Sequence, residues 1–158
     1  MLKIYPVETA EDLEVTRSIL CEYLACRESE TSIFPRELQS FRKQLSELPA
    51  EFSSPDGCLL LARDNREPVG CVGLRGLGDN ICEMKRLYVT PEFRRRGIGK
   101  ALAKEVIEKA KSIGYAWMRI DTFDDAAQAL YASLGFKEIE AYRYNPTEGV
   151  VFMELKLA

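Results

Sequence analysis

The chain has 158 residues, of which 46% are hydrophobic and 30% are charged, and its net charge is −3. This length is typical of one domain with a sizeable core, so we expect a single domain over residues 1–158. The acidic balance does not favour general binding to nucleic acid, and no apolar run approaches the ~18 residues of a membrane span. The first residues lack the apolar stretch of a signal peptide, which predicts a cytoplasmic protein.

The cysteine and histidine content limits the catalytic mechanisms and metal sites that the chain could have. The chain has five cysteines and no histidine, and three cysteines (Cys58, Cys71 and Cys82) lie in apolar, strand-like runs. We interpret these three as reduced core residues, in preference to a catalytic role. The lack of histidine excludes His-dependent metal sites and Cys–His or Ser–His nucleophiles, and we expect no metal.

Hydrophobic periodicity and turn residues predict the secondary structure in chain order. The expected elements are a strand (1–7), a helix capped by Thr9 that runs to about residue 26, a helix (35–48), three strands (58–63, 69–75 and 81–89), a helix (98–112), a strand (116–121), a helix capped by residue 124 or 125 that runs to 134, and two strands (136–138 and 150–155). Strands alternating with helices are typical of an α/β fold with a mixed central sheet of about seven strands flanked by helices.

The most distinctive segment lies between the strand that ends at Val89 and the helix that follows. Its residues are Arg94, Arg95, Arg96, Gly97, Ile98, Gly99 and Lys100. Glycines let backbone N–H groups face a ligand, a helix N-terminus adds the positive end of its dipole, and arginines suit phosphate. The spacing fits neither the P-loop, GxxxxGK[ST], nor the dinucleotide fingerprint, GxGxxG. The segment predicts an anion cradle, and the alternative is a glycine-rich turn before a surface helix.

Two motifs together resemble a known family. Residues 94–99 fit [QR]xxGx[GA], and residues 127–136 fit AxxLYxxxGF after an intervening helix and strand. In this order they resemble the GCN5-related N-acetyltransferase (GNAT) family, and the resemblance covers about residues 81–138. It implies the acyl-CoA N-acyltransferase fold, with a sheet that splays open between the strands 81–89 and 116–121, and acetyl-CoA as the co-substrate.

The resemblance also implies how the co-substrate is held. The backbone N–H groups from Arg95 to Lys100 would bind the pyrophosphate of acetyl-CoA, with a contribution from the side chain of Arg94. The pantetheine arm would pair with the strand around Leu87, Tyr88 and Val89. The N–H group of Leu87 would then donate to the oxyanion of the transition state.

One position departs from the family pattern. Members often have Asn seven residues before the tyrosine of the second motif, where it contacts the cofactor arm, and this chain has Asp124. An ionised Asp accepts hydrogen bonds but does not donate them. We therefore expect Asp124 to border the cofactor and to cap the following helix without the donated contact.

Two side chains are candidates for proton transfer. Tyr131 of the second motif would give a proton to the departing thiolate, and the alternative is a packed tyrosine with its hydroxyl at the surface. Glu83 lies eleven residues before Arg94. Family members that acetylate lysine carry a Glu at this spacing, so Glu83 would be the base. The alternative is an ion pair with Lys85 or Arg86 on a partly exposed strand.

The acceptor side is predicted from charge. Arg75, Arg86 and Tyr142 would bind the substrate, and the arginines would suit a carboxylate or a phosphate, whereas the alternative is a solvated strand face. We expect an N-acetyltransferase that acts on the primary amine of a small molecule by direct attack in a ternary complex. It would be a monomer or homodimer with no nucleic-acid or membrane partner. The alternatives are a non-catalytic acyl-CoA-binding or sensing domain and a protein lysine acetyltransferase.

Overall fold

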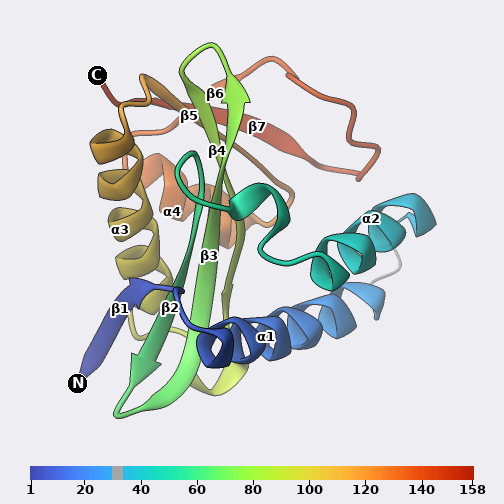
Figure 1. The fold of residues 1–158 in the computed structure, drawn as a ribbon. Helices are drawn as coiled ribbons and strands as arrows, with labels where there is room; N and C mark the ends of the chain where they lie inside the picture. Colours follow the sequence, from blue (N-terminus) through green and yellow to red (C-terminus); the bar gives the residue numbers. More distant parts are fainter. Residues whose placement is uncertain (30–33) are drawn as a thin grey trace.

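A computed structural model describes residues 1–29 and 34–158. Its elements in chain order are β1 (Leu2–Pro6), α1 (Ala10–Glu28), α2 (Pro35–Ser46), the short 3₁₀ helix η1 (Ala50–Phe52), β2 (Cys58–Asp64), β3 (Glu67–Gly78), β4 (Ile81–Val89), the 3₁₀ helix η2 (Pro91–Phe93), α3 (Ile98–Ile113), β5 (Trp117–Thr122), α4 (Asp125–Ser133), β6 (Lys137–Ile139) and β7 (Val151–Lys156) (Figure 1). The predicted order of strands and helices is confirmed. The main difference is that β3 continues three residues beyond its predicted end, to Gly78.

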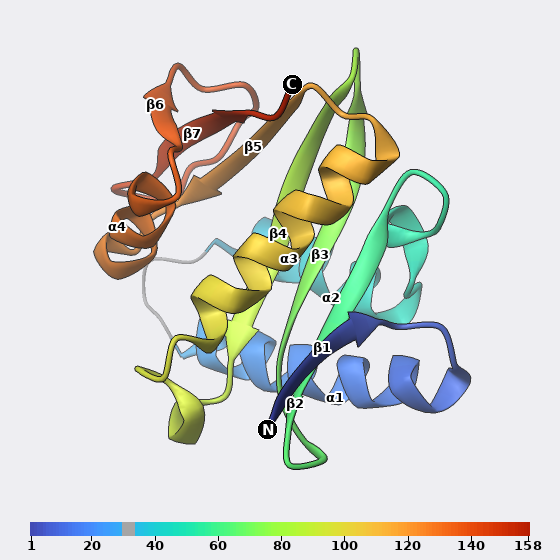
Figure 2. The same cartoon turned by 90° about the vertical axis from the view of Figure 1, so that its left-hand side faces the viewer.

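The seven strands form one mixed sheet in the order β1-β2-β3-β4-β5-β7-β6. Helices α1 and α2 lie on one face, and α3 lies on the other (Figures 1 and 2). Side chains of β2 alternate between the two faces, because successive residues of a strand point in opposite directions. Leu59 and Leu61 pack with α1 and α2, whereas Leu60 and Ala62 pack with α3. The sheet therefore has an apolar core on each side.

Helix starts follow from local capping. The side chain of Thr9 accepts the N–H of Asp12 at 3.0 Å, and the side chain of Asp124 accepts the N–H of Ala126 at 3.0 Å. Both residues are extended at the first position before their helix, as N-caps require. Asp124 is thus the cap of α4, one of the two positions predicted.

The sheet opens between β4 and β5, the one parallel pair in the sheet of the described residues. These strands pair at Ile81–Trp117, Cys82–Met118 and Glu83–Arg119. Beyond Glu83 the described part of β4 has no partner on this side, and the two strands diverge (Figure 2). The splay that the family resemblance implied is confirmed, and it creates the opening in which the candidate site lies.

The cysteines in the strands are core residues, as predicted. Cys58, Cys71 and Cys82 are buried, and burial raises the pKa of Cys71 and of Cys82 to about 12. Their thiols stay protonated at neutral pH and are not nucleophiles. In the described ranges, no helix is long and apolar enough to cross a membrane. The same ranges contain no group of three or more His, Cys, Asp or Glu side chains suited to a metal ion.

Candidate active site

A β-bulge in β4 marks the centre of the site. Cys71 of β3 faces Tyr88, but Gly73 faces Lys85, so two residues of β4, Arg86 and Leu87, stand opposite one residue of β3. Arg86 has a φ of +60°, a left-handed conformation that is uncommon for a residue with a side chain. A bulge takes one residue out of the ladder and bends the strand. Leu87, the expected oxyanion donor, therefore lies at an interruption of the ladder, on the strand that β5 leaves uncovered.

The loop before α3 has the geometry of an anion cradle. Arg95 and Gly97 have φ values of +65° and +79°, and α3 begins at Ile98. Within the described chain, no protein acceptor is recorded for the backbone N–H groups from Arg95 to Lys100. A Cβ atom placed on Gly97 would meet no atom within 4 Å. Unused amides at a helix N-terminus, with open space before them, fit the pyrophosphate of a coenzyme A thioester.

Arg94 and the two glycines of the loop differ in their roles. The Nε of Arg94 donates to the carbonyl oxygen of Val89 at 2.8 Å, which fixes the start of the loop. Gly97 needs the positive φ that glycine adopts without strain. Gly99 already lies in α3, and its backbone has no such requirement.

A cavity of ≈ 1170 Å³ lies in the opening of the sheet. At the end near the loop it is lined by Leu87, Val89, Arg94, Asp124 and Tyr131, all predicted cofactor residues. Tyr88, also predicted, lines it as well. Its other end is lined by polar side chains from α2, β3, β4 and the segment 143–147. The cavity thus extends from Arg94, the residue before the anion cradle, to a polar chamber, and Arg86 and Leu87 of the bulge also line it.

Tyr131 lies inside this cavity wall. Its side chain packs on Phe136, with ring centroids 5.5 Å apart, and the residue is only 7% exposed. Burial raises the pKa of the Tyr131 phenol. The hydroxyl therefore keeps its proton through the neutral range and can donate a hydrogen bond into the cavity.

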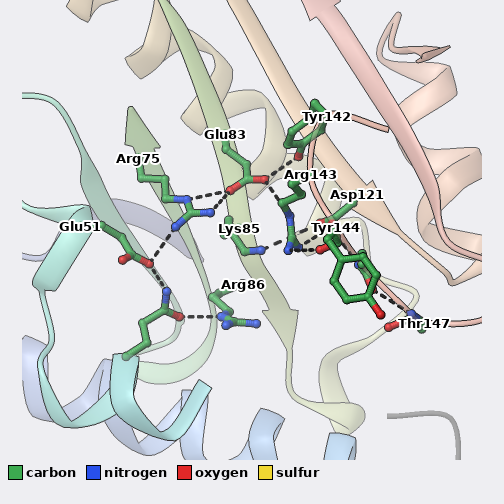
Figure 3. A network of polar contacts seen from close by, with 12 residues as sticks. Glu51, Arg75, Glu83, Lys85, Arg86, Asp121, Tyr142, Arg143, Tyr144 and Thr147 are labelled. Carbon is green, nitrogen blue, oxygen red and sulfur yellow. Dashed lines mark hydrogen bonds and ion pairs between the residues drawn. The ribbon is translucent and has the colours of Figure 1, made fainter. Parts of the chain in front are cut away.

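Glu83 is the centre of a buried polar network (Figure 3). It is fully buried, and its Oε1 accepts the Nε of Arg75 at 2.7 Å. Its Oε2 accepts the hydroxyl of Tyr142 and lies 3.7 Å from the Nε of Arg143. Glu83 and Tyr142 are not among the residues that line the cavity. These two predicted site residues therefore contact each other, and neither one contacts the cavity directly.

The alternative stated for Glu83 is wrong in its details. We expected an ion pair with Lys85 or Arg86 on a partly exposed strand, but the partners are Arg75 and Arg143, and the carboxylate is buried. The physical reason is register, since Arg75 stands directly opposite Glu83 across β3 and β4. Lys85, two residues from Glu83, instead approaches β5.

A second carboxylate, Asp121, was not predicted. It ends β5, accepts a hydrogen bond from Arg143 and another from the side-chain nitrogen of Asn145 (3.0 Å), and lies 4.0 Å from the Nζ of Lys85. Burial opposes ionisation of Asp121, but Lys85 and Arg143 hold its pKa below the usual range. Burial lowers the pKa of Lys85 to about 8, against the opposing effect of Glu83 and Asp121. Lys85 therefore remains mostly protonated at neutral pH.

Sequence reasoning also missed Glu51 and Arg143. Arg75 reaches Glu51 (3.3 Å) as well as Glu83, and Arg143 joins Glu83 to Asp121. Glu51 lies in the three-residue helix η1, and Arg143 lies in the irregular segment between β6 and β7. A single 3₁₀ turn and an irregular segment both lack a periodic sequence pattern that would place a polar residue in a site. Of the predicted substrate residues, Arg75 and Arg86 line the polar chamber.

Comparisons with known proteins agree with this geometry. The sequence matches the family model described as "Acetyltransferase (GNAT) family" over residues 19–136. It is 36% identical, over 99% of its length and 96% of the relative, to an uncharacterised N-acetyltransferase of Schizosaccharomyces pombe. It is 29% identical to an N-acetylaspartate synthetase of Xenopus tropicalis, over 85% of this chain and 46% of that protein. The paia N-acetyltransferase of Thermoplasma acidophilum, solved with coenzyme A, has a TM-score of 0.73 at 22% identity, covering 99% of both chains.

The match to the family model covers most of the chain, and the amide cradle before α3 and the bulge of β4 lie inside the matched residues. The chain therefore belongs to the GNAT acetyltransferase family and is an acyl-CoA-dependent acetyltransferase.

Proposed function

We propose that the protein transfers the acetyl group of acetyl-CoA to the primary amine of a small molecule, by direct attack in a ternary complex. The observation that carries this proposal is one cavity with two different ends. One end reaches Val89 and Arg94, next to the amide cradle from Arg95 to Lys100, and a chamber lined by charged side chains lies at the other end. The bulge at Arg86 and Leu87 separates the two, where the transferred group would have to sit.

The residues of the chain have separate tasks in this reaction. Acetyl-CoA supplies the acetyl group, and CoA leaves as a thiolate that takes up, through water, the proton that the amine loses. The cradle and Arg94 hold the phosphates, and the N–H of Leu87 donates to the carbonyl oxygen on which negative charge develops. The hydroxyl of Tyr131 donates to the departing sulfur from the cavity wall. Asp124 caps α4 and so fixes the helix that carries Tyr131.

Glu83 is assigned a positioning role rather than that of a base. Its oxygens already accept from Arg75 and Tyr142, and it has no place in the cavity lining. The amine must nevertheless be neutral to attack. Lys85, Arg86 and Arg143 line the chamber, and nearby cations lower the pKa of a bound ammonium group. The chamber itself thus favours the neutral amine, and water carries the proton away.

A small acceptor is favoured over a lysine side chain of a protein. Side chains of α2, β3, β4 and the segment 143–147 surround the polar chamber on several sides, which suits a compact molecule better than an extended peptide. The relative from Xenopus tropicalis is named for making N-acetylaspartate, which supports an acceptor of this size.

The proposal is tested by following CoA release from acetyl-CoA with a panel of small primary amines and a panel of lysine peptides. We expect release with at least one small amine, together with its acetylated product. Release with peptides alone would favour the protein acetyltransferase. Binding of acetyl-CoA without turnover on any amine would favour the sensing domain.

A further inference from the structure

The chamber contains a cation of the bulge, Arg86, that has no carboxylate in contact among the described residues. Cationic side chains that line the chamber are those of Arg36 and Lys43 from α2 and those of Arg75, Lys85, Arg86 and Arg143. Arg75 has Glu51 and Glu83 as partners, Arg143 has Glu83 and Asp121, and Lys85 has Asp121. In the described ranges, no carboxylate oxygen lies within 4.0 Å of the guanidinium group of Arg86. Arg86 reaches a carboxylate only indirectly, through Gln44, whose side-chain nitrogen donates to Glu51. Among Arg75, Lys85, Arg86 and Arg143, Arg86 is therefore the cation without a direct ion pair.

The guanidinium group of Arg86 is nonetheless held in place. Its Nε donates to the side-chain oxygen of Gln44 at 2.7 Å, and its Cζ lies 3.8 Å from the ring centroid of Phe41. Both partners belong to α2, so this helix holds the Nε side of the guanidinium group, and the fork formed by its two terminal nitrogens stays uncovered by these contacts. Stacking and a single hydrogen bond fix the plane of the group and leave the two terminal nitrogens without a recorded acceptor in the described chain.

Arg86 lines the cavity. Figure 3 shows a single dashed line at Arg86, to the unlabelled side chain of Gln44, while the rest of the fork points to the side on which Tyr144 lies. Arg86 is also the first residue of the bulge, next to Leu87. A ligand group bound to the fork would therefore lie in the same chamber as the acceptor amine.

Holding a half-buried charge with no carboxylate in contact is costly, and Arg86 also has a positive φ, which costs further free energy. Burial lowers the pKa of Arg86, yet an arginine stays charged in proteins. A guanidinium with two free, parallel N–H donors matches a carboxylate in a bidentate pair. One carboxylate also matches the single charge of Arg86, whereas a phosphate would bring up to two negative charges.

We propose that Arg86 is the binding site for a carboxylate of the acceptor, so that the substrates are amines that carry a carboxylate, such as amino acids. This inference rests on the proposed function and specifies its substrate class. Arg86 selects the acceptor by its charge, and Gln44 and Phe41 are positioning residues that hold the fork toward it.

The test compares acetylation of amino acids with that of their carboxamides, which keep the amine and the side chain but lack the negative charge. The full chain is used with saturating acetyl-CoA, and kcat/KM is measured for each pair. For the preferred amino acid we expect at least a 10-fold preference over its amide, since a charged hydrogen-bonded pair is worth a factor of about 10–100. In Arg86→Gln the preference should fall below about 3-fold, through loss of activity on the acid alone. Arg86→Lys should retain part of it.

The control is Arg42→Gln, which removes an exposed arginine of α2 that pairs with Glu28 and does not line the cavity. It should keep the wild-type preference. Melting temperature and CoA affinity are measured for every variant, so that a folding defect is not mistaken for lost recognition. Equal activity of wild type on acids and amides would overturn the carboxylate site while leaving the acetyltransferase function intact. A large loss of CoA affinity in Arg86→Gln would also overturn it, because Arg86 would then serve the co-substrate. Failure to acetylate any small amine would overturn the proposed function itself.

Discussion

Replacing Glu83 with Gln separates the two roles that this residue could have. The substitution keeps the size of the side chain and removes its charge. In the structure, Glu83 is fully buried and lies 2.7 Å from Arg75 and 3.7 Å from Arg143, so the variant would leave two cations less balanced in a poorly solvated place. A positioning role therefore predicts a clear loss of stability.

The size of that loss follows from the burial of the partners. Removing one member of a buried ion pair costs about 3–5 kcal/mol. Here the side chains of Arg75 and Arg143 are 25% and 28% exposed, so water compensates part of the loss. We expect destabilisation of about 2–3 kcal/mol, or a fall in melting temperature of roughly 4–12 °C for a domain of this size.

The assay combines chemical denaturation with steady-state kinetics on the same samples. Glu138→Gln, at an exposed carboxylate of β6, is the matched control and should change stability by less than about 0.5 kcal/mol. Adding Arg75→Met to the Glu83 variant should recover part of the loss, because one of the stranded cations is removed. Unchanged stability, together with a loss of about 10²-fold in kcat and of the acidic limb of the pH profile, would show that Glu83 is the base and refute this reasoning.

Three further changes test the rest of the site. Gly97→Val should weaken CoA binding by more than about 100-fold in calorimetry while the domain stays folded, because a β-branched residue resists the φ of +79°; wild-type affinity would place the cradle elsewhere. Tyr131→Phe should lower kcat by roughly 10- to 100-fold with little change in CoA affinity. The reason is that the phenol, whose pKa is raised, acts by donating a hydrogen bond to the sulfur, and the variant lacks that donor. An unchanged kcat would mean that Tyr131 is only a packing residue. Lys85→Met tests the lowered pKa of Lys85. From pH 7 to pH 9, the wild type should gain about 1 kcal/mol of stability relative to this variant. The folded-state pKa of about 8 lies below the unfolded value, so the unfolded wild-type chain binds more protons than the folded one in this window. A difference that does not vary with pH would contradict the lowered pKa of Lys85.

Local signals explain which features could be predicted from the sequence. The caps Thr9 and Asp124 act on amides two or three residues away, so the starts of α1 and α4 follow from short segments. The cradle before α3 is equally local, because its glycines and arginines are consecutive. Hydrophobic periodicity and turn residues predicted the order of the elements, the glycines and arginines predicted the loop, and the family resemblance implied the splayed sheet.

Long-range geometry explains what the sequence did not reveal. The bulge at Arg86 has no glycine to mark it, and its positive φ accompanies contacts to Gln44 and Phe41, more than forty residues earlier in the chain. The partners of Glu83 depend on the register between β3 and β4 and on the segment that carries Arg143. Pairing across a sheet and the path of an irregular segment are set by the whole fold, so the charge balance of the chamber becomes visible only in three dimensions.

In the proposed complex, acetyl-CoA lies at the cradle and the acceptor lies in the chamber beyond the bulge. A crystal structure of the protein with CoA and an N-acetylated amino acid tests it most directly. We expect the pyrophosphate on the backbone N–H groups from Arg95 to Lys100, the CoA sulfur near Tyr131 and Leu87, and the product's carboxylate on Arg86. Phosphates bound away from the loop, or an acetylated amine outside the opening between β4 and β5, would contradict it.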